Sequence, residues 1–540
     1  MAKYKINCPE KGNLLKMLLA DRVFVDNPCN GKGTCGKCKV KVTSGYCAPM
    51  SETERKLLKP KEIEKGIRLA CLTEITGSAI VEPLQKERRH KVLTKGYVPK
   101  FEKDSHDQGY GLMIDIGTTT VVTALVEMKT GNELAQASMI NAQKHFGLDV
   151  LTRITYEYEN PDRGIRELQE TIVNSINEMI GEVCLEAGID RTEICEIDVA
   201  ANCTMMHMLL GVDARPIGQS PYRPNFVEAK ELPASEIGIV AGEETRLYCL
   251  PSVSAYIGAD IVAGTYVCEL SKEKGNVLFI DIGTNGEIVL AGKGRLLCCS
   301  CAAGPALEGM NISSGMRAAK GAVEDVEITE AGIRLKTIGD QKPMGLCGSG
   351  ILAVVKELLR TGLVKKTGVF IKKEKLSEED YRYPMIRLDG IKREFILHQS
   401  PELLVTQGDV RQVQLAKGAI LSGFVALLSK ADIAMEDVDK VMIAGQFGTH
   451  LPADLLIGTG ILPEAVKDKL VYVGNSSKTG AYMALLSQRV KREAEELAEQ
   501  MEYMELAETE NYERIFTESM IFPEASDSLE SVKCTFKKEV

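Results

Sequence analysis

Alternation between polar and apolar positions predicts a small β-rich domain at the start of the chain. Residues 39–42 alternate polar and apolar side chains, as a half-buried strand does. Residues 3–7 read as a first strand and residues 14–19 as a helix. The Ser-x-x-Glu pattern at residues 51–54 is a capping box ahead of an apolar run. These elements predict one domain over residues 1–85.

Farther along, an apolar strand that ends in Asp-Ile-Gly-Thr occurs twice. Residues 111–122 and residues 277–290 each read as an apolar strand, Asp-Ile-Gly-Thr, a tight turn and a second strand. Residues 438–450 give a third strand, which ends in a glycine-rich turn with a helix expected after it. Between residues 85 and 108 the composition changes to charged residues with few aliphatics, which is typical of a linker. The predicted divisions are a domain over 1–85, a linker over 86–109, a middle lobe over 110–272 and a C-terminal lobe over 273–540.

Four cysteines of the first domain have the spacing of an iron–sulfur site. Cys29, Cys35 and Cys38 lie on a glycine-rich loop with the spacing C-x5-C-x2-C, and Cys71 follows in a separate segment. Three thiolates on one loop can surround iron from one side, and a fourth closes a [2Fe-2S] cluster. Plant-type ferredoxins have C-x4-C-x2-C, so this loop is one residue longer. The pattern predicts a [2Fe-2S] cluster that moves single electrons, with these four cysteines as its ligands.

The two Asp-Ile-Gly-Thr turns have the chemistry of a phosphate clamp. Glycine lets a phosphate approach the main chain, where amides and Thr hydroxyls donate to its oxygens. An ionised Asp cannot donate to a phosphate, but it suits a hydrated Mg²⁺, which prefers few carboxylates and several waters. Two such turns facing one another would hold a triphosphate from both sides, and the third turn can lie flat against adenine. ATP and Mg²⁺ are therefore the expected ligands.

Composition and charge narrow the class of protein. The formal net charge of −10 over 540 residues argues against a nucleic-acid partner and against an anionic membrane surface. No stretch approaches the ~18 apolar residues of a spanning helix, and residues 1–10 lack a signal-peptide core. Sixteen cysteines without an export signal indicate a reducing compartment. We expect a cytoplasmic protein, most economically that of an anaerobe, with no membrane partner.

The order of these motifs resembles known families. The two turns and the glycine-rich strand end are similar to the phosphate-1, phosphate-2 and adenosine motifs of the actin, Hsp70 and sugar-kinase superfamily. With the cysteine pattern, four short segments resemble the ATP-dependent reductive activators of corrinoid proteins: residues 299–309, 346–351, 406–411 and 475–481. The resemblance covers nearly the whole chain. It implies a multidomain α+β and α/β fold, in which a β-grasp ferredoxin domain precedes a two-lobed actin-like (ribonuclease H-like) ATPase.

The resemblance also implies roles for single residues. It gives Asp115 and Asp281 catalytic roles at the two turns. Ser349 fits a place near phosphate or, alternatively, a helix cap. Asn285 stands where the family more often has glycine, which leaves the phosphate geometry of the second turn open. The cofactor-binding residues implied are Gly117, Thr118, Thr119, Gly283, Thr284, Asn285, Gly304, Gly348, Ser349, Gly445, Gln446 and Gly448.

Members of the resembling family return corrinoid cobalt from Co(II) to Co(I). The resemblance thus implies an ATP-hydrolysing, metal-reducing oxidoreductase that passes one electron through its cluster and supports a corrinoid-dependent methyltransferase system. It implies a corrinoid protein as partner, an unidentified low-potential electron donor and a homodimer. The alternatives are a redox-linked ATPase that activates another low-potential enzyme, a kinase with an appended redox domain, and an ATP-gated docking protein whose cluster is structural.

Other residues with metal-binding chemistry have a plainer interpretation. His207 lies in an apolar helical pattern, which favours a core histidine over a cobalt ligand. Residues 493–510 predict a solvated helix with one packed face. A C-C-x-C run lacks familiar ligand spacing, and free cysteine is commonly buried as a small hydrophobe. Four cysteines in the C-terminal lobe are therefore weak candidates for a second metal: Cys298, Cys299, Cys301 and Cys347.

Overall fold

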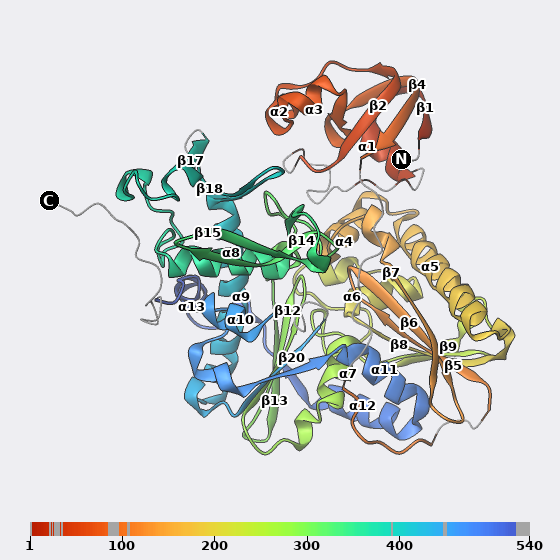
Figure 1. The fold of residues 1–540 in the computed structure, drawn as a ribbon. Coiled ribbons are helices and arrows are strands. Elements are labelled where there is room, and N and C mark those ends of the chain that lie inside the picture. Colours follow the sequence, from red (N-terminus) through yellow and green to blue (C-terminus); the bar gives the residue numbers. More distant parts are fainter. Residues whose placement is uncertain are drawn as a thin grey trace. The chain divides into compact units, whose positions relative to one another are not determined.

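The computed structural model describes most of the chain as two compact units. The described residues are 3–20, 23, 25, 33, 36–84, 97–104, 108–389, 392–445 and 451–524. Residues 1–90 form one unit and residues 91–540 form the other (Figure 1).

The first unit is a four-stranded sheet with short helices. Its sheet has the order β1-β4-β2-β3. Leu14 and Leu18 of the first helix are fully buried in the core of the unit, as the predicted helix over 14–19 requires. The elements are β1 (Tyr4–Asn13), α1 (Leu14–Ala20), β2 (Lys39–Cys47), α2 (Glu52–Leu57), α3 (Pro60–Glu64), β3 (Ile67–Leu69) and β4 (Glu74–Pro83).

The predicted capping box at residues 51–54 holds one of its two bonds and adds a buried ion pair. Ser51 caps α2 by accepting a hydrogen bond from the amide of Glu54. The Glu54 carboxylate is fully buried and binds the Arg68 guanidinium at 2.8 and 2.9 Å. It also accepts the amide of Leu69 at 2.8 Å. Because these bonds join α2 to β3, they fix the segment that leads into Cys71.

The second unit contains two six-stranded sheets built to one plan, which explains the repeated sequence. In the middle lobe the order is β7-β6-β5-β8-β10-β9, and in the C-terminal lobe it is β21-β20-β11-β12-β13-β22. Strand β5 is antiparallel to β6 and parallel to β8, and β11 is likewise antiparallel to β12 and parallel to β20. The two Asp-Ile-Gly-Thr turns therefore occupy equivalent places, between the first two strands of each sheet.

Each of these two sheets draws its strands from a wide span of the chain. In the middle lobe they are β5 (Tyr110–Ile116), β6 (Thr120–Glu127), β7 (Glu133–Ile140), β8 (Ile194–Ala201), β9 (Lys230–Pro233) and β10 (Arg246–Cys249). In the C-terminal lobe they are β11 (Val277–Ile282), β12 (Gly286–Gly292), β13 (Arg295–Cys301), β20 (Lys440–Ala444), β21 (Leu470–Gly474) and β22 (Met501–Tyr503).

Helices cover the sheets of the second unit. Those of the first half are α4 (Val150–Glu159), α5 (Gly164–Ala187), α6 (Cys203–Leu210) and α7 (Ala259–Val267). Those of the second half are α8 (Gly348–Arg360), α9 (Gln407–Ala431), α10 (Ala453–Gly458), α11 (Ser476–Leu486), α12 (Gln488–Gln500) and α13 (Tyr512–Ser519). Within the described part of the chain, α9 alone is long and apolar enough to cross a membrane, and 72% of its most apolar window is buried, as in a core helix.

Two further three-stranded sheets belong to the C-terminal lobe. One has the order β15-β14-β16, from β14 (Ala322–Thr329), β15 (Gly332–Thr337) and β16 (Gly345–Leu346). The other has the order β17-β18-β19, from β17 (Ile386–Asp389), β18 (Lys392–Gln399) and β19 (Glu402–Thr406).

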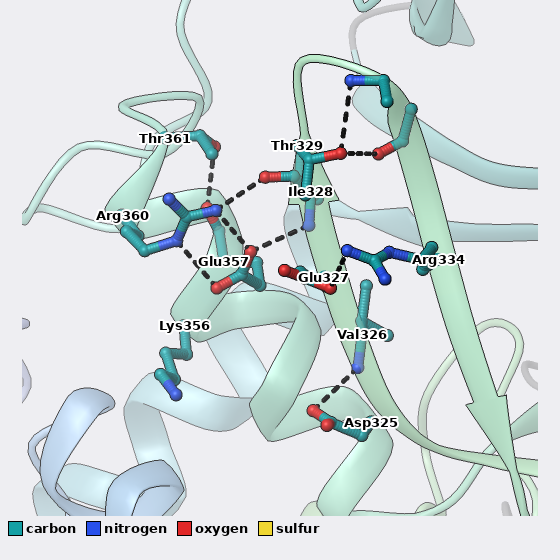
Figure 2. Close-up of polar contacts among 12 residues, drawn as sticks. Asp325, Val326, Glu327, Ile328, Thr329, Arg334, Lys356, Glu357, Arg360 and Thr361 are labelled. Atoms are coloured by element: carbon teal, nitrogen blue, oxygen red, sulfur yellow. Dashed lines mark hydrogen bonds and ion pairs between the residues drawn. The ribbon is translucent and has the colours of Figure 1, made fainter. Parts of the chain in front are cut away.

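A buried ion pair fastens the β14–β15 hairpin to α8 (Figure 2). Glu357 of α8 accepts the amide of Ile328 at 2.8 Å. Arg360 donates to both oxygens of Glu357, at 2.8 and 2.7 Å, and to the carbonyl of Ile328 at 2.6 Å. Glu357 is 6% exposed, so its charge requires this partner. The network holds α8, and with it the predicted site residues at its start, against the sheet.

Part of the predicted linker is attached to the second unit. The amide of Tyr97 donates to the carbonyl of Val473 at 3.0 Å, and the amide of Asp104 donates to that of Leu486 at 3.2 Å. The ring of Phe101 packs edge-on against Tyr482 at 6.0 Å between centroids. Residues 97–104 are therefore fixed along β21 and α11.

The chain after β21 returns to the middle lobe. Ala481, Leu485 and Val490 are buried in the same core as strands β5 and β8. The predicted boundaries near 85, 109 and 272 stay predictions, but the middle lobe also contains this late segment.

The predicted helix over residues 493–510 is wrong beyond residue 500. Helix α12 ends at Gln500, and residues 501–503 form β22, which pairs in parallel with β13 through Leu296 and Met501. A 3-10 turn over Leu506–Glu508 comes next. The open edge of the sheet offers these residues backbone hydrogen bonds, and that pairing overrides their helical spacing.

Candidate active site

The two Asp-Ile-Gly-Thr turns face one cleft between the lobes. Each turn closes on its glycine: the amide of Gly117 donates to the carbonyl of Thr120, and that of Gly283 to the carbonyl of Asn285, both at 2.9 Å. The second turn is one residue tighter, at the position where Asn285 departs from the family pattern. The residues that line the cleft are Asp115, Gly117, Thr118, Thr119, Thr120, Val122, Asn202, Asp260, Asp281, Ile282, Gly283, Thr284, Asn285, Glu287, Glu308, Gly445, Asn475 and Ser477.

Asp115 of the first turn is fastened to the start of α11. Its carboxylate accepts hydrogen bonds from Asn475 Nδ2 at 2.8 Å and from Ser477 Oγ at 2.7 Å. Burial raises the pKa of Asp115, and these two bonds, with the charge of Lys478, act against the rise. Asn475 also caps α11 through its side-chain oxygen. Asp115 thus joins β5 to the segment that returns from the C-terminal lobe.

Asp281 of the second turn has a different environment. Burial and the negative charge of Asp115 raise its pKa to about 7. Asp260 at the start of α7 has its pKa raised to about 8 by burial and by the charges of Asp281 and Asp115. Burial and the negative charges of Asp260 and Asp281 raise the pKa of Glu287 as well. These carboxylates therefore lie close enough to repel one another.

Glu308 joins the two turns from the side. It accepts a hydrogen bond from the hydroxyl of Thr284, in the second turn, and another from Thr119, in the first. Burial raises its pKa. A nucleotide phosphate that takes up either hydroxyl would have to replace a bond to Glu308, so this carboxylate is placed to respond to occupation of the cleft.

Two of the four predicted cluster ligands lie together in the first unit. The sulfurs of Cys38 and Cys71 are 3.2 Å apart and buried. Gly33 and Gly36, which precede Cys38 in the chain, have φ of 71° and 64°, a backbone conformation that favours glycine. Cys29 and Cys35 lie outside the described residues. Among the described ones, no three His, Cys, Asp or Glu side chains gather as a metal site.

Comparisons with known proteins match every part of this architecture. Residues 2–76 match the 2Fe-2S iron-sulfur cluster binding domain, residues 110–273 the RACo middle region, and residues 275–533 the C-terminal ASKHA domain of RACo. The corrinoid activation enzyme RamQ of Eubacterium limosum is 34% identical over 416 residues, which are 74% of this chain and 68% of that protein. The chain belongs to the family of corrinoid-protein activators.

Two more relatives agree with this family. The Co(II) methylated amine-specific corrinoid protein reductase of Methanosarcina barkeri is 24% identical over 443 residues, 75% of this chain and 76% of that protein. The solved structure of a reductive activator for corrinoid, iron-sulfur protein matches with a TM-score of 0.68 and 31% identity, over 96% of this chain and 98% of that one. The predicted ferredoxin-type domain followed by an actin-like ATPase, with a [2Fe-2S] cluster and ATP as cofactors, is thereby confirmed.

In this activator, two predicted cofactor-binding glycines that follow the second turn, Gly304 and Gly348, do not line the cleft. The amide of Gly304 donates to the carbonyl of Thr284 at 2.8 Å, so Gly304 supports the turn without lining the cleft. Gly348 begins α8, where a Cβ would stand 1.8 Å from the carbonyl oxygen of Leu307. That close approach requires glycine.

Ser349 and the adenosine-type turn complete the set of predicted residues. Ser349 Oγ lies 3.3 Å from the sulfur of Cys347 and is absent from the cleft lining. Gly445 lines the cleft with φ of 87°, and a Cβ there would meet an oxygen of Asp281 at 2.2 Å. Gln446 and Gly448 lie outside the described residues.

Sequence reasoning gave no role to several residues of the cleft. Asn202 caps α6 and donates from Nδ2 to the hydroxyl of Thr118 at 3.0 Å. Its place before an apolar helix was a capping signal, but its contact with the turn depends on the fold. Asp260 gave no motif at all. The other polar lining residues without an assigned role were Thr120, Glu287, Glu308, Asn475 and Ser477, although each stands in a segment that carried the resemblance.

The cysteines of the C-terminal lobe and His207 pack as core residues. Cys301 donates to the carbonyl of Gly286 at 3.0 Å and Cys347 to that of Val323 at 3.1 Å. The ring of His207 stacks on Phe226 at 4.2 Å between centroids. Its Nδ1 lies 2.8 Å from the carbonyl of Cys203, and its Nε2 accepts the amide of Asn225 at 3.2 Å, which satisfies both ring nitrogens. The core-histidine prediction is confirmed.

Proposed function

We propose that this chain performs the ATP-dependent reductive activation of a corrinoid protein. A reduced [2Fe-2S] cluster held by Cys38 and Cys71 would supply the one electron that converts Co(II) of the corrinoid protein to Co(I), and the cluster would be oxidised in return. The observation that carries the proposal is the presence, in one member of this family, of the buried Cys38–Cys71 pair and the carboxylate-lined cleft between two phosphate turns. Cys29 and Cys35 would complete the cluster.

ATP has a physical reason to take part. Moving one electron uphill costs about 1.4 kcal/mol for each ~59 mV of unfavourable potential. Nucleotide can shift a conformational equilibrium only if the two states bind it differently. Glu308 of the C-terminal lobe accepts hydrogen bonds from Thr284 of its own lobe and from Thr119 of the middle lobe, and these bonds would be exchanged when phosphate binds. We infer that ATP changes the arrangement presented to the partner and so raises the potential of the acceptor.

We also propose that the cleft binds Mg²⁺. Asp281 and Asp260 carry raised pKa values because buried negative charge is uncompensated there. A hydrated divalent cation would supply the missing positive charge and would neutralise phosphate oxygens. We assign Asp281 and Asp260 as the residues that hold it through water, with Asp115 near enough to contribute charge.

The remaining parts of the proposal rest on the family. We propose that the partner is the corrinoid protein of a methyltransferase system and that an unidentified low-potential carrier reduces the cluster. We also propose that the chain works in the cytoplasm as a homodimer, without nucleic acid or membrane. The domain divisions at residues 85, 109 and 272 belong to the same proposal.

Visible absorbance of a purified Co(II) corrinoid protein under anaerobic conditions tests this function. The chain and a low-potential reductant are mixed with it, and ATP is added last. Co(I) is expected to form only after ATP, and not with the Cys38→Ser variant, which removes a proposed cluster ligand. Co(I) formation at equal rates without ATP would overturn the proposal. A panel of corrinoid proteins identifies the partner.

A further inference from the structure

A second cavity lies beside the nucleotide cleft, between the lobes. It has a volume of about 430 Å³. It is lined by the first turn of α4, the start of α6, the loop before α7, strand β12 and the segment after β22. The acidic and aromatic residues that line it are Asp149, Glu287, Glu505, Tyr222, Tyr256 and Tyr503. Neither Lys nor Arg is among the described residues that line it.

Glu505 lies close to the aromatic rings of this cavity. The hydroxyl of Tyr503 donates to Glu505 at 2.9 Å. Burial raises the pKa of Tyr256 to about 12, with further contributions from Tyr222 and from the charge of Glu505. The rings of Tyr222 and Tyr256 lie 5.6 Å apart at 57°. The Glu505 carboxylate therefore lies beside tyrosine rings. A carboxylate and aromatic rings together attract an ammonium or guanidinium group.

Both carboxylates at the mouth keep capacity for a further donor. Asp149 caps α4 by accepting the amide of Thr152 at 2.7 Å. Glu505 accepts from the amide of Ala507 at 3.3 Å in addition to Tyr503. An ionised carboxylate has about four acceptor positions. Each of the two can thus receive a cation while it keeps the bonds that fix its place.

Exposed apolar side chains surround the mouth of the cavity. Leu151 and Tyr158 stand seven residues apart on the same face of α4 and are 56% and 45% exposed. Tyr222 at the rim is 40% exposed. The Tyr158 hydroxyl lies 3.1 Å from Gln219 Oε1, which places Tyr158 beside the loop that carries Tyr222. Apolar surface at the rim favours a protein as the source of the cation over a free amine.

The two cavities share a wall. Asn202, Thr284, Asn285 and Glu287 line the nucleotide cleft and the second cavity alike. Thr284 and Asn285 belong to the second phosphate turn, so an occupant of the second cavity lies one side chain away from the nucleotide. A partner group bound there is in a position to sense whether the cleft is occupied.

We propose that this cavity receives an arginine or lysine side chain of the corrinoid protein. The inference rests on the proposed function, which supplies the partner, and it adds the place where the partner docks. Charge complementarity carries it: the carboxylates of Asp149 and Glu505 lie in a cavity with three tyrosines and with no Lys or Arg among its described lining residues, which matches a positive group. The exposed apolar side chains beside the cavity match the protein around that group.

Binding of the corrinoid protein to charge-neutral variants tests the inference. The variant Asp149→Asn with Glu505→Gln removes two charges but keeps an acceptor oxygen at both caps, so the fold is preserved. The control, Glu508→Gln with Glu510→Gln, removes two exposed charges from the same segment, outside the cavity. The partner is the protein whose Co(II) the chain reduces, and its affinity is measured by interferometry at several salt concentrations.

The first variant is expected to bind the corrinoid protein at least about tenfold more weakly and with a smaller salt dependence. Its basal ATP hydrolysis and the affinity of the control variant should equal those of the unchanged chain. Affinity within twofold of the unchanged chain, or equal weakening in the control, would overturn the inference. Continued ATP-dependent Co(I) formation in that case would leave the proposed function intact.

A second measurement needs no partner. Saturation-transfer NMR with acetyl-arginine methylamide should give a signal with the full chain and none with the Asp149→Asn, Glu505→Gln variant. Acetyl-norleucine methylamide should give none with either. Absence of signal with the unchanged chain would overturn the inference. Micromolar binding of the free amide would also overturn it, because the site would then belong to a small amine.

Discussion

Two copies of Asp-Ile-Gly-Thr occupy equivalent places in two matching sheets, yet their aspartates lie in different surroundings. Asp115 accepts hydrogen bonds from Asn475 and Ser477, and Lys478 is near. For Asp281, the described residues supply no hydrogen-bond donor, and its pKa rises to about 7. One carboxylate is already engaged in fastening two parts of the chain. The other is left available for a cation.

The repeated motif therefore determines where each aspartate lies in its sheet, but it does not determine what the aspartate does. Both turns place glycine amides and Thr hydroxyls at a strand end. The surroundings of the two aspartates differ because Asp115 accepts hydrogen bonds from the start of α11, which returns from the C-terminal lobe. We therefore expect Asp281 to matter most for chemistry and Asp115 to matter most for stability.

Removal of the Asp281 charge should have the largest effect. In Asp281→Asn, ATP-dependent Co(I) formation is expected to fall by about 10²-fold or more, because a metal's charge stabilisation is worth several kcal/mol. Stopped-flow absorbance of the corrinoid measures the rate. The cluster's own absorbance should be unchanged. A rate within threefold of the unchanged chain would contradict the assignment of Asp281.

The buried acids should make metal-free stability depend on pH. The ordinary pKa of Asp is 3.8, but in the folded chain it is about 7 for Asp281 and about 8 for Asp260. The folded state thus keeps protons that the unfolded state has lost, so the free energy of unfolding falls as pH rises from about 4 to about 8. Calorimetry in EDTA should show the melting temperature falling over this range.

Saturating Mg²⁺ should reduce that fall, since a cation favours the ionised carboxylates. In the double variant Asp260→Asn, Asp281→Asn the fall should be smaller even in EDTA. If the double variant and the unchanged chain give the same slope, the buried charge lies elsewhere.

Truncation of Asp115 should act on stability more than on charge. Asp115→Ala removes the acceptor of the hydrogen bonds from Asn475 Nδ2 and Ser477 Oγ, and the loss costs about 1–3 kcal/mol at the buried Ser477 hydroxyl. The melting temperature of the metal-free protein should drop. Asp115→Asn keeps one acceptor oxygen and should drop less. If both variants have the melting temperature of the unchanged chain, the link between β5 and α11 contributes nothing to stability.

The smallest effect is expected at Ser349, which resembled a phosphate-binding residue. Its hydroxyl contacts Cys347 and does not line the cleft. Ser349→Ala should therefore change the KM for ATP by less than about twofold, measured by phosphate release. A tenfold rise in KM would place this residue in the nucleotide site in the working conformation.

Local patterns predicted the parts of the fold that local physics determines. The two strand–turn–strand units arise from apolar strands and from turns that need glycine, and the cap at Ser51 arises from capping chemistry. The return of α11 into the middle lobe was not predictable, because its burial depends on a sheet formed some 300 residues earlier in the chain. The same holds for residues 501–503, whose helical spacing yields to an open sheet edge.

The site divides in the same way. Asp115, Asp281, Thr118 and Thr284 were predictable because glycine turns and carboxylates at strand ends have a chemistry of their own. Asp260 became visible only when folding brought the start of α7 against both turns. The sequence near Asp260 gives no sign of this tertiary contact.

In the proposed function, ATP bound in the cleft provides the free energy for the reduction, and the cluster provides the electron. The most direct measurement follows both chromophores in one anaerobic sample of the Asp281→Asn chain, with the cluster reduced beforehand, Co(II) corrinoid protein present and ATP added last. In this variant the cluster should stay reduced and Co(II) should persist, while the unchanged chain oxidises its cluster as Co(I) appears. Co(I) formation by the variant at the rate of the unchanged chain would show that the cleft does not power the reduction.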